Sequence, residues 1–228
     1  MAQIFGVRFH VLHDCPGTSS RSTVTAFALN ADTAVSGFFV QLPLPDGLDA
    51  MPLISAINPA KDVDGLSPES AGRLFVGLPS LLPCTPHGVI QILKRNGIEL
   101  SGREAVVVGR SNLVGKPLSQ LLLRENATVT VCHSRTEDLA EVTRRADVLV
   151  VAAGRREMIG AEHVREGAVV VDVGIHRREE GGLVGDVKFE EVEPVASHIT
   201  PVPGGVGPMT RAMLLYNTLQ AAQIDSAS

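Results

Sequence analysis

Four short apolar runs, separated by stretches with helical spacing, constrain the fold of this chain more than any other feature. The runs are Ala105–Gly109, Ala127–Cys132, Asp147–Ala152 and Ala168–Val173, and each is rich in valine. Nearly continuous apolar strands are buried on both faces, as in parallel sheets covered by helices. The alternation therefore predicts a doubly wound, Rossmann-like α/β domain, which we place at residues 82–204.

The flanking segments predict a second, smaller α/β domain made of residues 1–81 and 205–228, closed by the last helix of the chain. A stretch rich in proline and glycine, Pro201–Pro208, fits neither a helix nor a strand. The expected helices are Lys116–Glu125, Thr136–Arg145, Ala161–Val164, Ser20–Leu29, Met51–Ile57 and Thr210–Ala222. The expected strands outside the large sheet are Gly6–Leu12 and Gly37–Leu42.

Composition argues against several classes of protein. The chain has 20 Lys and Arg against 25 Asp and Glu, and this acidic balance argues against nucleic-acid binding. No apolar run approaches the roughly 18 residues of a membrane span, and Met1–His10 does not resemble a signal peptide. Three scattered cysteines, Cys15, Cys84 and Cys132, indicate reduced thiols in a cytoplasmic protein rather than disulfides or zinc ligands.

Histidine gives little support for a metal site. His10 and His13 are three residues apart in an extended stretch, so their side chains point to opposite faces. We therefore expect no bound metal.

The turn Gly109–Gly115 joins an expected strand to an expected helix, where a dinucleotide-binding motif belongs. Its pattern is GxSxxxG rather than GxGxxG, because Ser111 stands at the place of the second glycine. Free backbone N–H groups and the positive end of the helix dipole suit a pyrophosphate at this position. The alternative is an ordinary strand–helix turn that happens to contain two glycines.

The next strand ends in Cys132-His133-Ser134-Arg135 and offers no carboxylate for a ribose 2′-hydroxyl. Ser134 and Arg135, with Arg110 from the preceding turn, suit a 2′-phosphate instead. This pattern favours NADP over NAD, and His133 also follows the strand closely enough to contact the cofactor. The alternative is a solvated arginine beside a serine that caps a helix.

Three further segments are weaker signals. Asp62 and Asp64 lie in one turn, where a carboxylate could accept two N–H bonds from a heterocycle or simply stabilise the turn. Gln41 stands near the end of an expected strand, where ligands of α/β sheets bind. The loop Pro201–Met209 exposes backbone groups toward a flat ligand or forms a rigid corner.

Together these segments resemble the bifunctional methylenetetrahydrofolate dehydrogenase/cyclohydrolase family over roughly Asn30–Asn217. The matching stretches occur in family order: GFFVQLPLP (Gly37–Pro45), NPAKDVDGL (Asn58–Leu66), PCTPHG (Pro83–Gly88), VVVGRSNLVGKP (Val106–Pro117), CHSRT (Cys132–Thr136), DVGI (Asp172–Ile175) and TPVPGGVGPMT (Thr200–Thr210). The resemblance implies oxidation of 5,10-methylenetetrahydrofolate to the methenyl form with NAD(P), often followed by hydrolysis to 10-formyltetrahydrofolate, in a homodimer.

The resemblance also implies roles for particular residues. Gln41 and Asp64 would orient the substrate and are the candidate catalytic residues. The candidate cofactor contacts are Thr85, Gly109, Arg110, Ser111, Gly115, His133, Ser134, Arg135 and Ile175. The candidate folate contacts are Val40, Gln41, Leu42, Asp64, Pro203, Gly204, Gly205, Val206 and Gly207.

One departure from the family concerns a Tyr-x-x-x-Lys motif in its N-terminal region, whose lysine is central to the hydrolytic step. The only tyrosine here is Tyr216, and no lysine stands in such a setting. We therefore expect the cyclohydrolase activity to be weak or absent, since a positioned proton-transfer group contributes roughly 10²–10⁴-fold. We also expect the smaller domain to lack a strand, which leaves a sheet edge to be covered.

Two alternatives remain open. A family relative redirected to another C–N bond or imine would explain the missing motif, although the retained folate contacts argue against it. A catalytically inactive binding paralogue would hold NADP or folate tightly without turnover.

Overall fold

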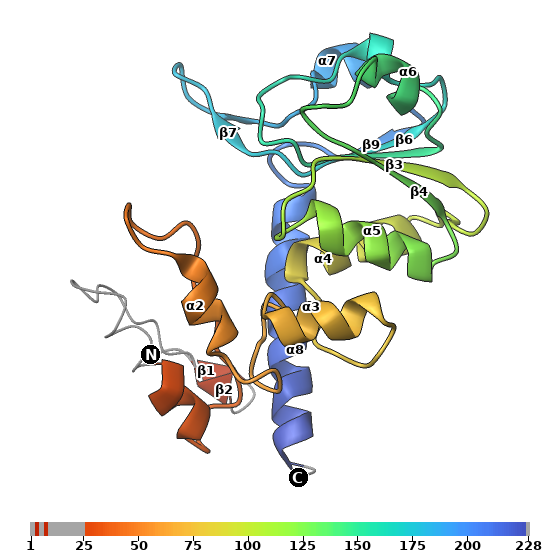
Figure 1. Ribbon diagram of the computed structural model, residues 1–228. Coiled ribbons are helices and arrows are strands. Elements are labelled where there is room, and N and C mark those ends of the chain that lie inside the picture. Colours follow the sequence, from red (N-terminus) through yellow and green to blue (C-terminus); the bar gives the residue numbers. More distant parts are fainter. Residues whose placement is uncertain (1–2, 5–6, 9–25, 227–228) are drawn as a thin grey trace. The chain divides into compact units, whose positions relative to one another are not determined.

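The computed structural model describes residues 3–4, 7–8 and 26–226, and the chain divides into two compact units (Figure 1). Cys84–Met213 form one unit, which we call the sheet unit. Met1–Pro83 and Leu214–Ser228 form the other, which we call the split unit because its two parts are far apart in the sequence.

The sheet unit contains a five-stranded parallel sheet with the order β4-β3-β5-β6-β9. Its strands are β3 (Glu104–Val108), β4 (Thr128–Cys132), β5 (Val148–Val151), β6 (Val169–Asp172) and β9 (His198–Ile199). The first four coincide with the valine-rich runs, so the predicted Rossmann-like fold class is confirmed. The fifth was missed because two residues without an apolar pattern leave no strand signal.

Helices cover both faces of this sheet (Figure 1). On one face lie α4 (Cys84–Arg95) and α5 (Gly115–Arg124), and on the other lie α6 (Leu139–Thr143) and α7 (Phe189–Val192). The short 3-10 helix η1 (Ala161–His163) contacts α6. Burial is complete where the layers meet, as at Val107, Leu118 and Leu149, each with no exposed area.

A β-hairpin of β7 (His176–Arg177) and β8 (Leu183–Val184) follows β6. The expected helix Thr136–Arg145 is shorter in the structure, because Thr136 belongs to a turn. The backbone N–H of His133 donates to Thr136 Oγ1 at 2.9 Å, and the Thr136 N–H donates back to the His133 carbonyl at 2.9 Å. Only after this turn does the chain become helical.

The split unit contains β1 (Gln3–Ile4) paired with β2 (Val7–Arg8), a helix at residues 26–31, α2 (Ala50–Ser55) and α3 (Pro68–Phe75). The long helix α8 (Val206–Ser226) belongs to this unit from Leu214 onward. Val63, Leu81, Leu214 and Ala221 pack together in its core. Asn217 Nδ2 donates to the carbonyls of Val63 and Leu82, each at 2.8 Å, and thereby joins α8 to the unit's first part.

Two expectations about elements were wrong. The segment Gly37–Leu42 is not a strand, since it forms only the single parallel bridge Phe38–Asp62. The ladder stops because the chain turns away after Asp62, whose carboxylate accepts the N–H groups of Leu66 and Ser67. The helix α8 begins at Val206 rather than Thr210, because Pro208 occupies its first turn, where a missing N–H removes no helical bond.

The remaining expected elements near the N-terminus fall partly outside the described residues. Of Gly6–Leu12, the structure describes Val7–Arg8, and of Ser20–Leu29 it describes residues 26–29, which are helical. His10, His13 and Cys15 lie outside the described residues.

Asp147, at the amino end of β5, makes stability depend on pH. Its carboxylate accepts the Glu104 N–H at 2.8 Å and pairs with Arg165. The Glu104 hydrogen bond, helped by Arg165, lowers the pKa of Asp147 below the ordinary value of 3.8. A lowered folded-state pKa stabilises the fold above the unfolded-state value, and the contribution is lost as pH falls through the folded-state value.

We therefore expect Asp147→Asn to lower the free energy of unfolding at pH 7 by roughly 1 kcal/mol. The difference from the parent protein should shrink as pH falls below about 4, the unfolded-state value, and should vanish below the lowered folded-state pKa, where the Asp147 side chain is neutral as well. Urea unfolding followed by circular dichroism at pH 7, 5, 4 and 3 measures this. A difference that stays constant down to pH 3 would contradict the assignment.

Candidate cofactor and substrate sites

The turn after β3 is close-packed in the manner of a dinucleotide-binding loop. Gly109 has φ +129°, and a Cβ there would overlap the backbone carbonyl of Ala152 at the end of β5. A Cβ on Gly115 would overlap the carbonyl of Gly109. Ser111 Oγ accepts the N–H of Val114, the residue before α5, at 3.1 Å. The turn thus fits a ligand that needs close approach of the backbone.

The carboxyl end of β4 lies beside this turn, because the Gly109 N–H donates to the Cys132 carbonyl at 2.9 Å. His133 Nδ1 accepts the Arg135 N–H at 3.1 Å, so this ring nitrogen carries no proton in that bond. Ser134 and Arg135 are exposed, as is Arg110 in the neighbouring turn. Ser134 does not cap α6, whose N-cap residue is Asp138.

A cavity of about 750 Å³ opens in the sheet unit, at the carboxyl end of β6 and the start of α8. Ile175, 60% exposed, lies on its wall, and Thr85 Oγ1 is 2.9 Å from Thr210 Oγ1 at its edge. The cavity brings together these predicted site residues: Thr85, Ile175, Pro203, Gly204, Gly205, Val206 and Gly207. Ligands of open α/β sheets bind at this edge.

The other predicted folate contacts lie in the split unit. The segment of Val40, Gln41 and Leu42 follows Phe38, and Asp64 follows Asp62, the partner of Phe38 in the parallel bridge. Gln41 is exposed, and its Nε2 donates to the Leu42 carbonyl at 2.8 Å. Asp64 is half-buried.

Two neighbours of Asp64 have structural roles. Lys61 is 8% exposed, and its ammonium donates to the carbonyls of Leu29, Asn30 and Asp32 at 2.8–3.2 Å. The carboxylate of Asp62, 1% exposed, accepts two backbone N–H bonds and the hydroxyl of Ser70. The two acidic residues of the turn therefore differ: Asp62 is buried and holds the turn together, while Asp64 is half-buried.

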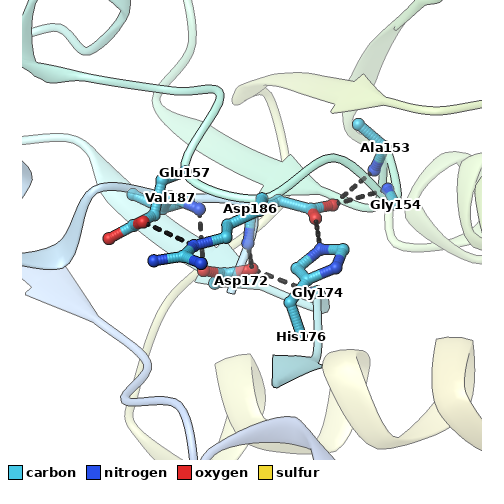
Figure 2. Close-up of polar contacts among 9 residues, drawn as sticks. Ala153, Gly154, Glu157, Asp172, Gly174, His176, Asp186 and Val187 are labelled. Atoms are coloured by element: carbon cyan, nitrogen blue, oxygen red, sulfur yellow. Dashed lines mark hydrogen bonds and ion pairs between the residues drawn. The ribbon is translucent and has the colours of Figure 1, made fainter. Parts of the chain in front are cut away.

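The sequence interpretation missed a buried polar cluster beside the cavity (Figure 2). Asp172, at the end of β6, accepts the N–H groups of Gly174, Asp186 and Val187, each at 2.9 Å. These hydrogen bonds lower the pKa of Asp172, but burial has the larger effect and raises the pKa above its ordinary value. The nearby charge of Asp186 raises it further. Asp186 in turn pairs with His176 at 2.7 Å. Of this cluster, only residues of the stretch Asp172–Ile175 were singled out from the sequence, as part of a family motif.

The described residues contain no group of three or more His, Cys, Asp or Glu side chains placed to hold a metal ion. Cys84 and Cys132 are buried thiols. Within residues 26–226 and the two short strands before them, no helix is both long and apolar enough to span a membrane.

A parallel sheet with a close-packed glycine turn after β3 and a cavity at its carboxyl edge defines a dinucleotide-binding protein of the Rossmann class. Family profiles narrow this class. The tetrahydrofolate dehydrogenase/cyclohydrolase NAD(P)-binding domain matches residues 83–226, and the catalytic domain of the same family matches residues 2–64.

Individual relatives agree. The bifunctional protein FolD 1 of Rubrobacter xylanophilus is 74% identical over 215 residues, which cover 93% of this chain and 76% of the relative. The crystal structure of the bifunctional enzyme FolD from Campylobacter jejuni is 49% identical with a TM-score of 0.89, covering 91% of this chain and 74% of that one.

A third relative is the Trypanosoma brucei methylenetetrahydrofolate dehydrogenase-cyclohydrolase, solved with NADP cofactor and an inhibitor. It is 38% identical with a TM-score of 0.88, covering 93% of this chain and 75% of that one. The chain belongs to the tetrahydrofolate dehydrogenase/cyclohydrolase family of enzymes, and the resemblance drawn from its motifs is confirmed.

Proposed function

We propose that this chain oxidises 5,10-methylenetetrahydrofolate to 5,10-methenyltetrahydrofolate with NADP. The observation that carries the proposal is the 750 Å³ cavity at the carboxyl edge of the sheet, lined by Ile175 and the loop Pro203–Gly207. NADP supplies the acceptor for the hydride that leaves the one-carbon bridge. The protein's own task in such a reaction is to bind and orient two flat ring systems.

The sheet unit supplies the proposed cofactor contacts. Gly109, Ser111 and Gly115 form the turn at the start of α5, whose backbone N–H groups and helix dipole attract a pyrophosphate. Arg110, Ser134 and Arg135, with His133, supply hydrogen-bond donors for a 2′-phosphate. Thr85 and Ile175 line the cavity, where we assign them to the nicotinamide end.

Both units supply proposed substrate contacts. The carboxylate of Asp64 accepts paired N–H bonds from the pterin ring, and Gln41 offers an amide that can both donate and accept. Val40 and Leu42 give apolar contact, and the backbone of Pro203–Gly207 lies against the folate. Gln41 and Asp64 thus orient the one-carbon bridge for hydride transfer.

For the second activity, the relatives do not support the expectation of a weak or lost cyclohydrolase. The relatives from Rubrobacter xylanophilus and Campylobacter jejuni are both named as bifunctional. We therefore propose that this chain is also bifunctional and hydrolyses the methenyl product to 10-formyltetrahydrofolate. Lys61 is not the proton-transfer group of that step, because its ammonium is held by three backbone carbonyls.

A coupled absorbance assay tests both activities. Purified protein is incubated with 5,10-methylenetetrahydrofolate and NADP⁺, and separately with NAD⁺, while reduced nicotinamide and the methenyl chromophore are followed. We expect reduced nicotinamide with NADP⁺ and rapid decay of the methenyl signal. Persistence of the methenyl signal would restrict the function to the dehydrogenase. Absence of turnover despite NADP binding would favour a redirected enzyme or an inactive paralogue.

The cofactor preference gives a separate prediction. Replacing Arg135 and Arg110 together by alanine removes two cations from the proposed 2′-phosphate site. We expect KM for NADP to rise roughly tenfold or more, since hydrogen bonds to charged groups contribute about 1.5–3 kcal/mol each. KM for NAD should change little. An equal rise for both cofactors would place these arginines elsewhere than the 2′-phosphate.

Three broader expectations are retained as proposals. We propose a homodimer in the cytoplasm, with the NAD(P)-binding domain at residues 82–204 and the folate-binding domain at residues 1–81 plus 205–228. The two compact units support a division into two domains, although the boundary between the units falls within α8, at Leu214, rather than before the helix. Light scattering after size-exclusion chromatography measures the oligomeric state.

A further inference from the structure

Asp186 lies at the centre of the cluster in Figure 2 and has no exposed area. Its Oδ2 accepts the backbone N–H groups of Ala153 and Gly154, at 2.7 and 2.8 Å. Its Oδ1 is 2.7 Å from His176 Nε2. One carboxylate therefore joins the loop after β5 to the first residue of the hairpin that follows β6.

Both of these segments adjoin the proposed cofactor site. Ala152 immediately precedes the two N–H donors, and its carbonyl is the group against which Gly109 packs. His176 immediately follows Gly174 and Ile175, which line the 750 Å³ cavity. Asp186 thus fixes the loop after β5 and the segment on the wall of the cavity at once.

The cluster leaves little room for adjustment. A Cβ on Gly174 would overlap Asp186, and a Cβ on Gly185 would overlap the Asp172 carboxylate. Asp172 accepts the Asp186 N–H at 2.9 Å, and the Asp172 N–H donates to Thr200 Oγ1 at 2.8 Å. Thr200 directly precedes the loop Pro201–Pro208, which also lines the cavity. The hydrogen-bond network therefore reaches the start of that loop.

We propose that Asp186 is a positioning residue for hydride transfer: its carboxylate holds the loops after β5 and β6 in one register, and so fixes the nicotinamide end of the cofactor. The proposal rests on the dehydrogenase function proposed above. Asp186 touches neither cofactor nor substrate in this role. It acts through Ala153, Gly154 and His176.

The proposal separates two kinetic effects. The proposed phosphate contacts, Ser111, Ser134 and Arg135, make no bond to Asp186, so the affinity for NADP should be nearly unchanged when Asp186 is replaced. The nicotinamide should instead be misplaced relative to the one-carbon bridge, and a misplacement of about 1 Å can lower the rate roughly 100-fold. The effect should therefore appear in kcat rather than in KM.

The test compares Asp186→Ala with two milder variants and a matched control. His176→Ala removes one of the three bonds, and Asp186→Asn keeps an oxygen for Ala153 and Gly154 while its amide can donate to neutral His176. Asp147→Ala is the control, because its carboxylate also accepts a backbone N–H, at 2.8 Å, but at the opposite end of β5.

We expect Asp186→Ala to lower kcat roughly 10–100-fold while KM for NADP changes less than about threefold. Asp186→Asn should recover most of that loss, and His176→Ala should give an intermediate kcat. With substrate deuterated at the one-carbon bridge, the isotope effect on kcat should increase in Asp186→Ala, because hydride transfer becomes slower than other steps. Asp147→Ala should lose stability with kcat within about twofold of the parent.

Two measurements, NADPH emission and amide hydrogen exchange, test the proposal without depending on enzyme turnover. NADPH emission on binding reports the surroundings of the nicotinamide, and the chain has no Trp to interfere. Asp186→Ala should bind NADPH with affinity near the parent's but with a smaller emission change. Amide hydrogen exchange should show that residues 153–154 and 174–176 lose protection together.

The outcomes are distinguishable from failure of the proposed function. A parent protein without dehydrogenase activity overturns that function, while the emission and exchange measurements still decide the role of Asp186. If kcat fell and KM rose to the same extent in Asp186→Ala and in Asp147→Ala, the role of Asp186 would be merely structural. Unchanged exchange at residues 153–154 in His176→Ala and Asp186→Ala would also overturn the proposal. If Asp186→Ala does not fold, Asp186→Asn and His176→Ala carry the comparison.

Discussion

Gly109→Ala is expected to lower kcat/KM for NADP roughly 100-fold. The change adds a Cβ where the backbone carbonyl of Ala152 already lies, at a φ of +129° that L-residues rarely adopt. Backbone strain and overpacking each cost about 1–3 kcal/mol, and about 1.4 kcal/mol corresponds to a factor of ten. The turn must shift, and the pyrophosphate loses its backbone donors. Steady-state kinetics with NADP and direct NADPH titration measure the effect.

Gly102→Ala is the matched control for this variant. Gly102 also has a positive φ, of +74°, but a Cβ there meets nothing within 4 Å. Gly102→Ala should therefore report backbone strain without overpacking. We expect it to lower the melting temperature and to leave kcat/KM for NADP unchanged. If Gly109→Ala and Gly102→Ala had the same small effect on NADP binding, the turn after β3 would not be the cofactor site.

Asp64→Ala is expected to lower kcat/KM for 5,10-methylenetetrahydrofolate by roughly 100-fold or more. A hydrogen bond to a charged group contributes about 1.5–3 kcal/mol, and the proposed contact contains two of them. NADPH binding should be unchanged, because Asp64 lies in the split unit and the proposed cofactor contacts lie in the sheet unit. Initial rates at varied folate, with NADPH titration in parallel, measure both.

Asp46→Asn serves as the control, since Asp46 is an exposed carboxylate in the same unit. It should leave both folate and NADP kinetics unchanged. Should Asp64→Ala retain parental kcat/KM for folate, the substrate would have to be held by other residues, and the proposed role of Asp64 would be withdrawn.

The parallel sheet could be predicted because its signal is local. The strand β3, for example, is buried from Ala105 to Val108, and this burial on both faces requires the run of valines that the sequence displays. The turn at Gly109 could be predicted for a related reason, since its glycines stand between a recognisable strand and a recognisable helix. The loop Pro203–Gly207 was found from the family motif, and the structure places it on the cavity wall.

Features that depend on long-range partners could not be predicted in the same way. Gly37–Leu42 has a strand pattern, but the chain that should pair with it leaves after one bridge at Asp62. Asp186 binds backbone N–H groups more than 30 residues away at Ala153 and Gly154, and such donors have no sequence signature. By contrast, the start of α3 carried a readable signal that went unused, because Ser67 caps it and Pro68 begins it.

The path of α8 has a consequence for synthesis on the ribosome. The split unit needs Asn217 to bond the carbonyls of Val63 and Leu82, and Ala221 to complete its core. At about 5–20 residues per second, the wait between Pro83 and Leu214 lasts roughly 7–26 s. We therefore expect the sheet unit to fold first, although it is synthesised second. The N-terminal part of the split unit should stay incompletely folded, and open to chaperones, until α8 emerges from the ribosome.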